Sequence, residues 1–233
     1  MTEPAADAPI QLDRAPPVAT ITLNRPEKRN ALEVEDFERV AEALARVLEA
    51  EEVRAVMLTG AGDKAFCAGA ALGDVATRDW SDNPLTALCD GIEAFPLPTI
   101  CALNGGPYGG GLEIALACDF RIAREGVRCF IPPAKLGIHY EPAGISRAMR
   151  VAGMQVARRL FLAAETFDDR AMLAAGLVDR LVPPEALAAE ARGFAGTLAG
   201  MAPLAMRGMK RAILELSHDA LDADAARARI AEA

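Results

Sequence analysis

The sequence predicts an α/β protein whose second half is almost entirely helical. Up to about residue 145, short β-branched or apolar segments alternate with segments of helical periodicity. After Gly144, one Ala/Leu/Arg-rich helical segment follows another, with Gly or Pro at the breaks. No low-complexity linker and no repeat separates the halves, so we expect the helical half to pack on the α/β half or on a neighbouring subunit.

The first half opens with a polar stretch, and we expect residues 1–17 to form an N-terminal tail. Strands are expected where β-branched or apolar runs end at turn residues, and a helix where apolar residues recur on one face. The predicted strands are 18–24, 53–60, 98–105, 119–123 and 128–132. The predicted helix is 36–50, with Phe37, Val40, Ala41, Leu44, Val47 and Leu48 on its apolar face.

The second half is predicted to contain five helices and one short extended segment. We expect the core domain to span residues 18–197 and a C-terminal helical region to span 198–233. A helical region of this kind is often an oligomerisation element. The predicted helices are 145–153, 154–165, 168–176, 183–200 and 203–216, and the extended segment is 176–183.

Composition narrows the class of protein. The chain has 233 residues, of which 52% are hydrophobic and 25% are charged, as in ordinary globular domains. The net charge of −8 argues against a general nucleic-acid or anionic-membrane surface. The first residues lack the basic and apolar regions of a secretory signal, and no apolar stretch is long enough to span a bilayer. We therefore expect a cytoplasmic protein.

Cysteine and histidine are placed in a way that argues against a metal site. The five cysteines are widely spaced and form no CxxC pair, which favours reduced thiols in the core. The chain has only two histidines, His139 and His218, for which we expect no catalytic role.

A glycine-rich loop leads into an apolar helix in the stretch GGPYGGGLEIALACDF, residues 105–120. A dinucleotide fingerprint beginning at Gly109 would need glycine at position 114, which is Ile114, and no lysine follows the loop as in a P-loop. Bare N–H groups at a helix start instead suit a carbonyl oxygen that becomes negative during reaction. One donor of such an oxyanion hole is typically worth about 10²–10³ in rate.

A second donor loop is predicted in FCAGAAL, residues 66–72, where small residues again follow a strand and a turn. Either loop alone would be read as a tight turn. Together they suggest two N–H groups converging on one ligand atom.

Glu113 is an ionisable residue in the first turn of the helix that follows the glycine-rich loop. Its neighbours Leu112, Ile114, Leu116 and Ala117 are apolar on every side, which predicts a buried helix. Burial would raise the pKa of the Glu113 carboxyl toward the range useful for acid–base catalysis. The alternative is a solvated carboxylate that stabilises a helix N-terminus.

Five motifs together resemble the crotonase (enoyl-CoA hydratase/isomerase) superfamily over about residues 18–215. They are NRPEKRNAL, FCAGAAL, ALNGGPYGGGLEIALACDFRIA, PAKLG and GLVDRLVP. The resemblance implies a crotonase-like spiral of ββα turns with a C-terminal helical trimerisation region. It also implies an acyl-CoA substrate, a homotrimer or dimer of trimers, and no cofactor other than the coenzyme A carried by the substrate.

The resemblance also assigns site residues. The oxyanion-hole donors would be the amides of Ala70 and Gly110, and Glu113 would move a proton. The residues implied along the coenzyme A arm are Lys28, Ala31, Leu32, Ala71 and Leu72. The acyl pocket would be shaped by residues 76–88, by 130–140 and by Phe161.

The sequence departs from the family pattern where hydratases carry a second glutamate, since alignment on PAKLG puts Pro133 there. Tyr140 and Glu141 follow, and either could supply the missing catalytic group. We therefore expect an atypical hydratase or isomerase. The alternatives are a decarboxylase like methylmalonyl-CoA decarboxylase, whose loop resembles PAKLGIHY, and an acyl-CoA binding protein that has lost its activity.

Overall fold

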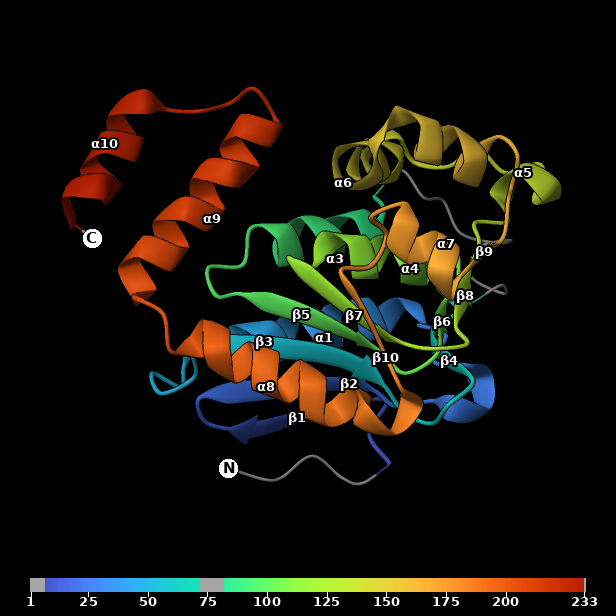
Figure 1. Cartoon of the computed structure of the whole chain (residues 1–233), viewed down its shortest axis with the longest axis horizontal. Coiled ribbons are helices and arrows are strands. Elements are labelled where there is room, and N and C mark those ends of the chain that lie inside the picture. Colours follow the sequence, from blue (N-terminus) through green and yellow to red (C-terminus); the bar gives the residue numbers. More distant parts are fainter. Residues whose placement is uncertain (1–6, 72–81, 233) are drawn as a thin grey trace.

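A six-stranded sheet forms the centre of the fold, in the order β1-β2-β3-β5-β7-β10 (Figure 1). Strands β2 to β10 run parallel, and β1 pairs antiparallel with β2 at one edge. The structure is a computed structural model that describes residues 7–71 and 82–232. The strands of this sheet are β1 (Ile10–Ala15), β2 (Val18–Leu23), β3 (Ala55–Gly60), β5 (Thr99–Leu103), β7 (Phe120–Arg124) and β10 (Arg180–Val182).

Helices cover both faces of the sheet, which explains why its central strands are apolar without alternation. On one face, α8 packs Leu187, Ala191 and Ala195 against the sheet. On the other face lies the larger core, to which α1, α3, α4 and α6 contribute. Their bounds are α1 (Val34–Leu48), α3 (Pro84–Glu93), α4 (Gly110–Ala117), α6 (Pro142–Phe161) and α8 (Leu187–Ala199).

The N-terminal tail predicted over residues 1–17 is wrong for its second part, because Ile10–Ala15 form strand β1. Each residue of β1 has a partner in β2, from Ile10 opposite Leu23 to Ala15 opposite Val18. Main-chain pairing orders this segment, while Ile10 and Leu12 pack against the core.

The amphipathic helix predicted over 36–50 is confirmed as α1, with two corrections to its apolar face. Phe37, Val40, Leu44 and Val47 are buried as expected. Ala41 and Leu48 are exposed because they line an open groove between α1 and α3, whereas Ala43 is buried. The spacing of apolar residues in α1 does not show which of them α3 covers.

In the second half, the two helices predicted at 145–153 and 154–165 form one element, α6, with a break at Gly153. Gly153 has φ 82°, a conformation that favours glycine, so the expected boundary is present as a kink. Further short elements are η1 (Pro26–Lys28), β8 (Arg128–Cys129), α5 (Pro133–Leu136), β9 (Phe167–Asp168) and η2 (Pro184–Ala186). The remaining helices are α7 (Asp169–Ala174), α9 (Pro203–Ser217) and α10 (Ala223–Glu232).

Helices α9 and α10 extend from the end of α8 along one side of the molecule (Figure 1). Lys210 of α9 ties this region to the core, because its ammonium donates to Asp119 at 2.6 Å and to the Leu97 carbonyl at 3.1 Å. Over residues 7–71 and 82–232, no helix is both long enough and apolar enough to cross a membrane. All five cysteines are buried and free, as expected.

Candidate active site

Two short parallel strands bring the predicted donor loops together. β4 (Ala65–Cys67) and β6 (Gly106–Pro107) form a separate two-stranded sheet. Ala70 follows the end of β4 by three residues, and Gly110 follows the end of β6 by the same number. Since the carboxyl ends of parallel strands lie at the same edge, both loops emerge side by side. This topology places the loops of the two sequence motifs next to each other; that their N–H groups converge on one ligand atom stays a prediction.

The amides of Ala70 and Gly110 have no acceptor within the described part of the chain. Their neighbours in both loops are bonded: Ala71 donates to Leu32, and Gly111 donates to Tyr108. The two loops touch, because a Cβ added at Gly69 would lie 2.7 Å from the Gly110 nitrogen. Gly69 also has φ +86°, so only glycine fits this approach without strain.

Glu113 lies in the first turn of α4 and is buried, with 2% of its surface exposed. Both carboxylate oxygens accept charged or polar hydrogen bonds. The Tyr140 hydroxyl donates to Oε2 at 2.7 Å, and the Arg147 guanidinium donates to Oε1 at 2.6 Å. The carboxylate therefore has one defined orientation.

Burial raises the pKa of Glu113 above its ordinary value, although the Tyr140 hydrogen bond and the charge of Arg147 act in the opposite direction. Burial also raises the pKa of Tyr140 far above its usual range, and the neighbouring Glu113 charge adds to this effect. The Tyr140 hydroxyl is thus neutral and donates its hydrogen bond to Glu113.

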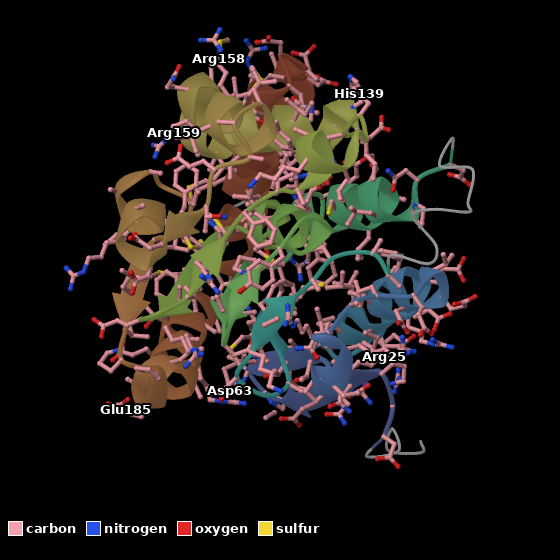
Figure 2. All side chains as sticks on the ribbon, turned by 90° about the vertical axis from the view of Figure 1, so that its right-hand side faces the viewer. Arg25, Asp63, His139, Arg158, Arg159 and Glu185 are labelled. Atoms are coloured by element: carbon pink, nitrogen blue, oxygen red, sulfur yellow. The ribbon has the colours of Figure 1, made fainter. Side chains whose placement is uncertain are left out.

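One pocket of about 240 Å³ joins these groups. The predicted donors Ala70 and Gly110 line it together with Glu113, Tyr140 and Glu141. His139 also lines this pocket, and Figure 2 shows it at the outer edge of the molecule. The other lining residues are Ala68, Asn83, Leu85, Gly109, Pro132, Pro133, Leu136 and Ile138.

Pro133 and Glu141 occupy different parts of this pocket's wall. Pro133 begins the short helix α5, and its ring presents no group that could exchange a proton. Glu141 is exposed and stands at the N-terminus of α6, where its side chain makes no capping hydrogen bond. Glu113 and Glu141 are the carboxylates that the described chain presents to the pocket.

The residues implied along the coenzyme A arm lie beside the first donor loop. Leu32 is buried and brackets Ala70: its amide donates to the Gly69 carbonyl at 2.9 Å, and its carbonyl accepts from Ala71 at 2.8 Å. Ala31 is half-buried, and Lys28 is exposed with its ammonium 3.0 Å from Glu33. Leu72 and residues 76–81 lie outside the described residues.

Sequence reasoning missed the charged cluster behind Glu113. Arg147 is 1% exposed and bonds Asp90 and Glu93 of α3 as well as Glu113. Within an Ala/Arg-rich helix, an arginine is ordinarily read as part of the solvated face. Gly144 offered a signal, because a small residue one turn before Arg147 lets α6 approach another element closely.

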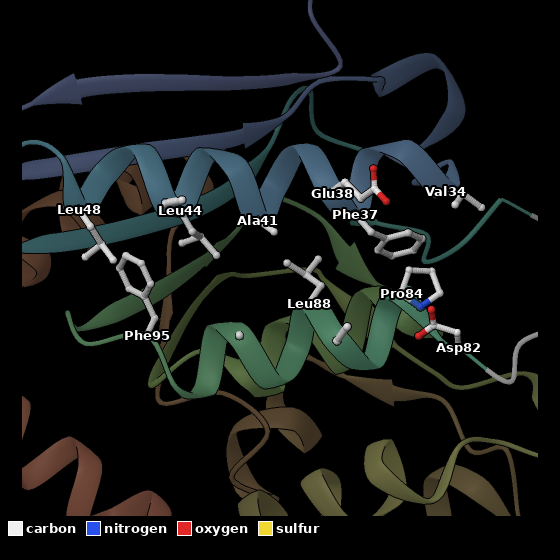
Figure 3. A pocket seen from close by; sticks show the side chains of 13 residues that line it. Val34, Phe37, Glu38, Ala41, Leu44, Leu48, Asp82, Pro84, Leu88 and Phe95 are labelled. Atoms are coloured by element: carbon white, nitrogen blue, oxygen red, sulfur yellow. The ribbon is translucent and has the colours of Figure 1, made fainter.

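A larger cavity of about 450 Å³ lies elsewhere, in the groove between α1 and α3 (Figure 3). Phe37, Leu44, Leu88 and Phe95 point into it. Glu38 and Asp82 stand at its wall. Part of the stretch 76–88, predicted to shape the acyl pocket, lines this groove, but Ala70, Gly110 and Glu113 do not. Cavity volume alone therefore does not single out the pocket that holds Glu113.

The family profile described as enoyl-CoA hydratase/isomerase matches residues 13–230. The chain belongs to the enoyl-CoA hydratase/isomerase family. One curated relative is the (E)-benzylidenesuccinyl-CoA hydratase of Thauera aromatica. It is 36% identical, over 88% of this chain and 81% of the relative. The short-chain-enoyl-CoA hydratase of Clostridium acetobutylicum is 33% identical, over 88% of this chain and 80% of the relative.

Solved structures of the enoyl-CoA hydratase/isomerase family share the fold. An enoyl-CoA hydratase/carnithine racemase from Magnetospirillum magneticum has a TM-score of 0.88 and 32% identity, covering 96% of this chain and 86% of its own. The enoyl-CoA hydratase of Bacillus anthracis has a TM-score of 0.86 and 32% identity, covering 97% of this chain and 89% of its own. The crotonase-like α/β fold predicted from the sequence is thus confirmed, and the protein is an enzyme of this family.

Proposed function

We propose that the protein acts on an acyl-CoA thioester through an enolate, in a hydratase or isomerase reaction that depends on one buried carboxylate. The observation that carries this proposal is a pair of amides, of Ala70 and Gly110, that have no acceptor among residues 7–71 and 82–232 and lie in the same pocket as Glu113. Two such donors suit the oxygen of a thioester that gains negative charge. Coenzyme A itself would enter as part of the substrate.

Glu113 is the proton-moving group in this reaction. Its carboxylate would take a proton from a carbon next to the developing charge, and the electron pair of that C–H bond would pass into the enolate. Returning the proton to another carbon gives isomerisation. Addition of water instead needs a group that holds the water, and Glu141 is the carboxylate at the pocket wall that could do so.

The first test is turnover of a short 2-enoyl-CoA, followed by loss of the conjugated thioester absorbance. Glu113→Gln keeps the shape of the side chain but cannot exchange a proton, so we expect a loss of about 10²–10⁴ in kcat. Glu165→Gln removes a partly exposed carboxylate paired with Arg159 and serves as the matched control. Equal turnover by wild type and Glu113→Gln would show that the assigned role is wrong.

Deuterium exchange and Glu141→Gln separate isomerisation from hydration. Under isomerisation by Glu113 alone, the Glu141→Gln variant keeps exchange at the substrate α or γ carbon. Under hydration assisted by Glu141, this variant loses water addition while exchange persists. Acyl-CoA binding without turnover or exchange on any thioester would instead indicate an inactive binding protein.

A decarboxylase is the second candidate, favoured by Pro133 in the wall and by the Tyr140–Glu113 hydrogen bond. In that reaction the bond to the departing CO₂ breaks and its electron pair forms the enolate. The enolate carbon then takes a proton from an acid in the site. Incubation with methylmalonyl-CoA tests this reaction, and CO₂ release no greater than the blank rejects it.

For assembly, we propose a homotrimer or dimer of trimers. Apolar side chains are exposed along α9, including Leu204, Met209, Ile213 and Leu216. An apolar surface of this kind is common at subunit contacts.

A further inference from the structure

Arg147 lies behind Glu113, outside the wall of the active-site pocket. Its Nη1 donates to Glu113 Oε1 at 2.6 Å. Its Nη2 donates to Asp90 Oδ1 at 2.6 Å and to Glu93 Oε2 at 3.1 Å. One buried guanidinium thus joins the carboxylate of the site to two carboxylates of α3.

The charges of this cluster do not cancel. Asp90, Glu93 and Glu113 carry three negative charges, while Arg147 and Arg150 carry two positive charges, since Arg150 also pairs with Glu93 at 2.8 Å. Arg147 therefore shares its attraction among three partners. Glu113 receives only part of it, although the contact between the two is short and buried.

We propose that Arg147 is a positioning residue for Glu113, and that Asp90 sets how strongly Arg147 favours the charged form of that carboxylate. This inference rests on the proposed role of Glu113 as the proton-moving group. Arg147 holds one carboxylate oxygen and Tyr140 holds the other, so together they fix the plane of the carboxylate. Arg147 does not touch the pocket and acts only through Glu113.

The hydrogen-bond partners of Arg147 lie on two sides of its side chain, an arrangement that arginine can satisfy and lysine cannot. The planar guanidinium presents donors in a fixed fork, which reaches Glu113 on one side and α3 on the other. An ammonium is a point charge on a flexible stem and cannot hold this geometry. Gly144 makes the arrangement possible, because a Cβ there would lie 2.6 Å from Glu113 Oε2.

The groups that face Glu113 give the sign of the expected titration shift. The negative charge of Asp90 raises the pKa of Glu113, whereas Arg147 and Tyr140 lower it. Burial raises the pKa of the Cys89 thiol well above its usual value, so this thiol is neutral near pH 7. The titratable or charged residues around Glu113 are Tyr140, which precedes α6, Arg147 on α6, and Cys89, Asp90 and Glu93 on α3.

Asp90→Asn is the first test, and it changes a side chain that is largely exposed. Removing the negative charge of Asp90 lets the positive charge of Arg147 act more strongly on Glu113, so the pKa of Glu113 should fall. The limb of the pH–rate profile that reports Glu113 should move to lower pH by roughly half a pH unit. Asp224→Asn, which removes an exposed carboxylate paired with Arg227 on α10, should leave the profile unchanged.

Arg147→Lys is the second test, because it keeps the charge and removes the fork. A misplaced Glu113 should lower kcat about a hundredfold, while KM stays near the wild-type value. Arg159→Lys is the matched control on the same helix, because Arg159 pairs with Glu165 at 2.6 Å. Figure 2 shows Arg159 near the outer edge of the molecule. An Arg147→Lys enzyme with wild-type kcat would overturn the proposal.

A readout independent of activity keeps this inference separable from the proposed function. In protein labelled with ¹³C at glutamate carboxyls, the Glu113 signal is identified by its loss in Glu113→Gln. Its titration midpoint should be lower in Asp90→Asn than in wild type. A midpoint that stays in place or rises refutes the inference even in an active enzyme, whereas a lowered midpoint in a protein without turnover refutes only the proposed function.

Discussion

At the scale of single residues, Glu113 was predictable and Arg147 was not. Glu113 is the one ionisable residue in an apolar helix that follows a glycine-rich loop, and both features are visible in the sequence. Arg147 belongs to a helix with several arginines, and its burial depends on α3 and α4 meeting it in space. Local sequence does not carry that information, because it arises from contacts between distant segments.

Gly144 provides a prediction at the same scale. In Gly144→Ala the new Cβ would lie 2.5 Å from Tyr140 Cε1 and 2.6 Å from Glu113 Oε2, so the helix or the carboxylate must shift. We expect kcat to fall about tenfold or more if Glu113 moves the proton as proposed, because a small displacement of such a group is costly. Enzyme assays and thermal unfolding measure the effect.

Gly193→Ala on α8 is the control for this change. Gly193 has nothing within 4 Å of an added Cβ, so the substitution should leave activity unchanged and stabilise the fold by about 0.5–1 kcal/mol. If Gly144→Ala also leaves activity unchanged, the close approach of α6 to Glu113 does not matter for activity.

At the scale of elements, the regular strands and helices followed from apolar periodicity, while β1 and α3 were missed. β1 offers only Ile10 and Leu12 as alternating apolar residues and depends on pairing with β2. α3 had a readable start, since Asn83 caps it by accepting from Leu85 and Thr86 and Pro84 follows. Gly91 in its interior weakened the helical pattern.

Asp36 provides a prediction for the start of α1. Its side chain is fully buried and accepts from Arg25 at 2.6 Å, from Arg39 at 2.7 Å and from the Glu33 amide at 2.9 Å. Asp36→Ala would leave these donors without their acceptor, so we expect the free energy of unfolding to fall by about 3 kcal/mol. Denaturant unfolding checks this value.

Glu35→Ala on the same helix turn is the comparison, because Glu35 is exposed. It should change the free energy of unfolding by no more than about 0.5 kcal/mol. Equal effects of the two substitutions would mean that the buried ion pairs do not stabilise the start of α1.

At the scale of the whole molecule, the layered α/β architecture was predictable, but the position of each helix in it was not. Alternating strands and helices predict a parallel sheet covered on both faces, and the structure has that arrangement. Which helix covers which face depends on the packing of segments far apart in the chain. The coenzyme A arm and the assembly proposed above also lie beyond what one sequence specifies by pattern.

The exposed apolar face of α9 gives a prediction about assembly. Ile213 is 68% exposed, and we expect it to lie within a subunit contact. Ile213→Asp should shift the sedimentation coefficient toward the monomer, because a charge would be buried without a partner. Ser217→Asp, an exposed polar position at the end of α9, should leave the assembly as in wild type, and a monomeric wild-type protein would contradict the prediction outright.

The irregular pairing of β4 with β6 determines how the two loops of the site are placed relative to each other. Ala65 pairs with Gly106 and Cys67 with Pro107, so β4 advances by two residues while β6 advances by one. A strand rises by about 3.3 Å per residue, so deleting the extra residue would slide one donor loop past the other by more than a hydrogen bond's length. The spacing of the Ala70 and Gly110 amides thus depends on one extra residue in β4. We expect an insertion or deletion there to disrupt the pocket but not the six-stranded sheet, to which β4 and β6 do not belong.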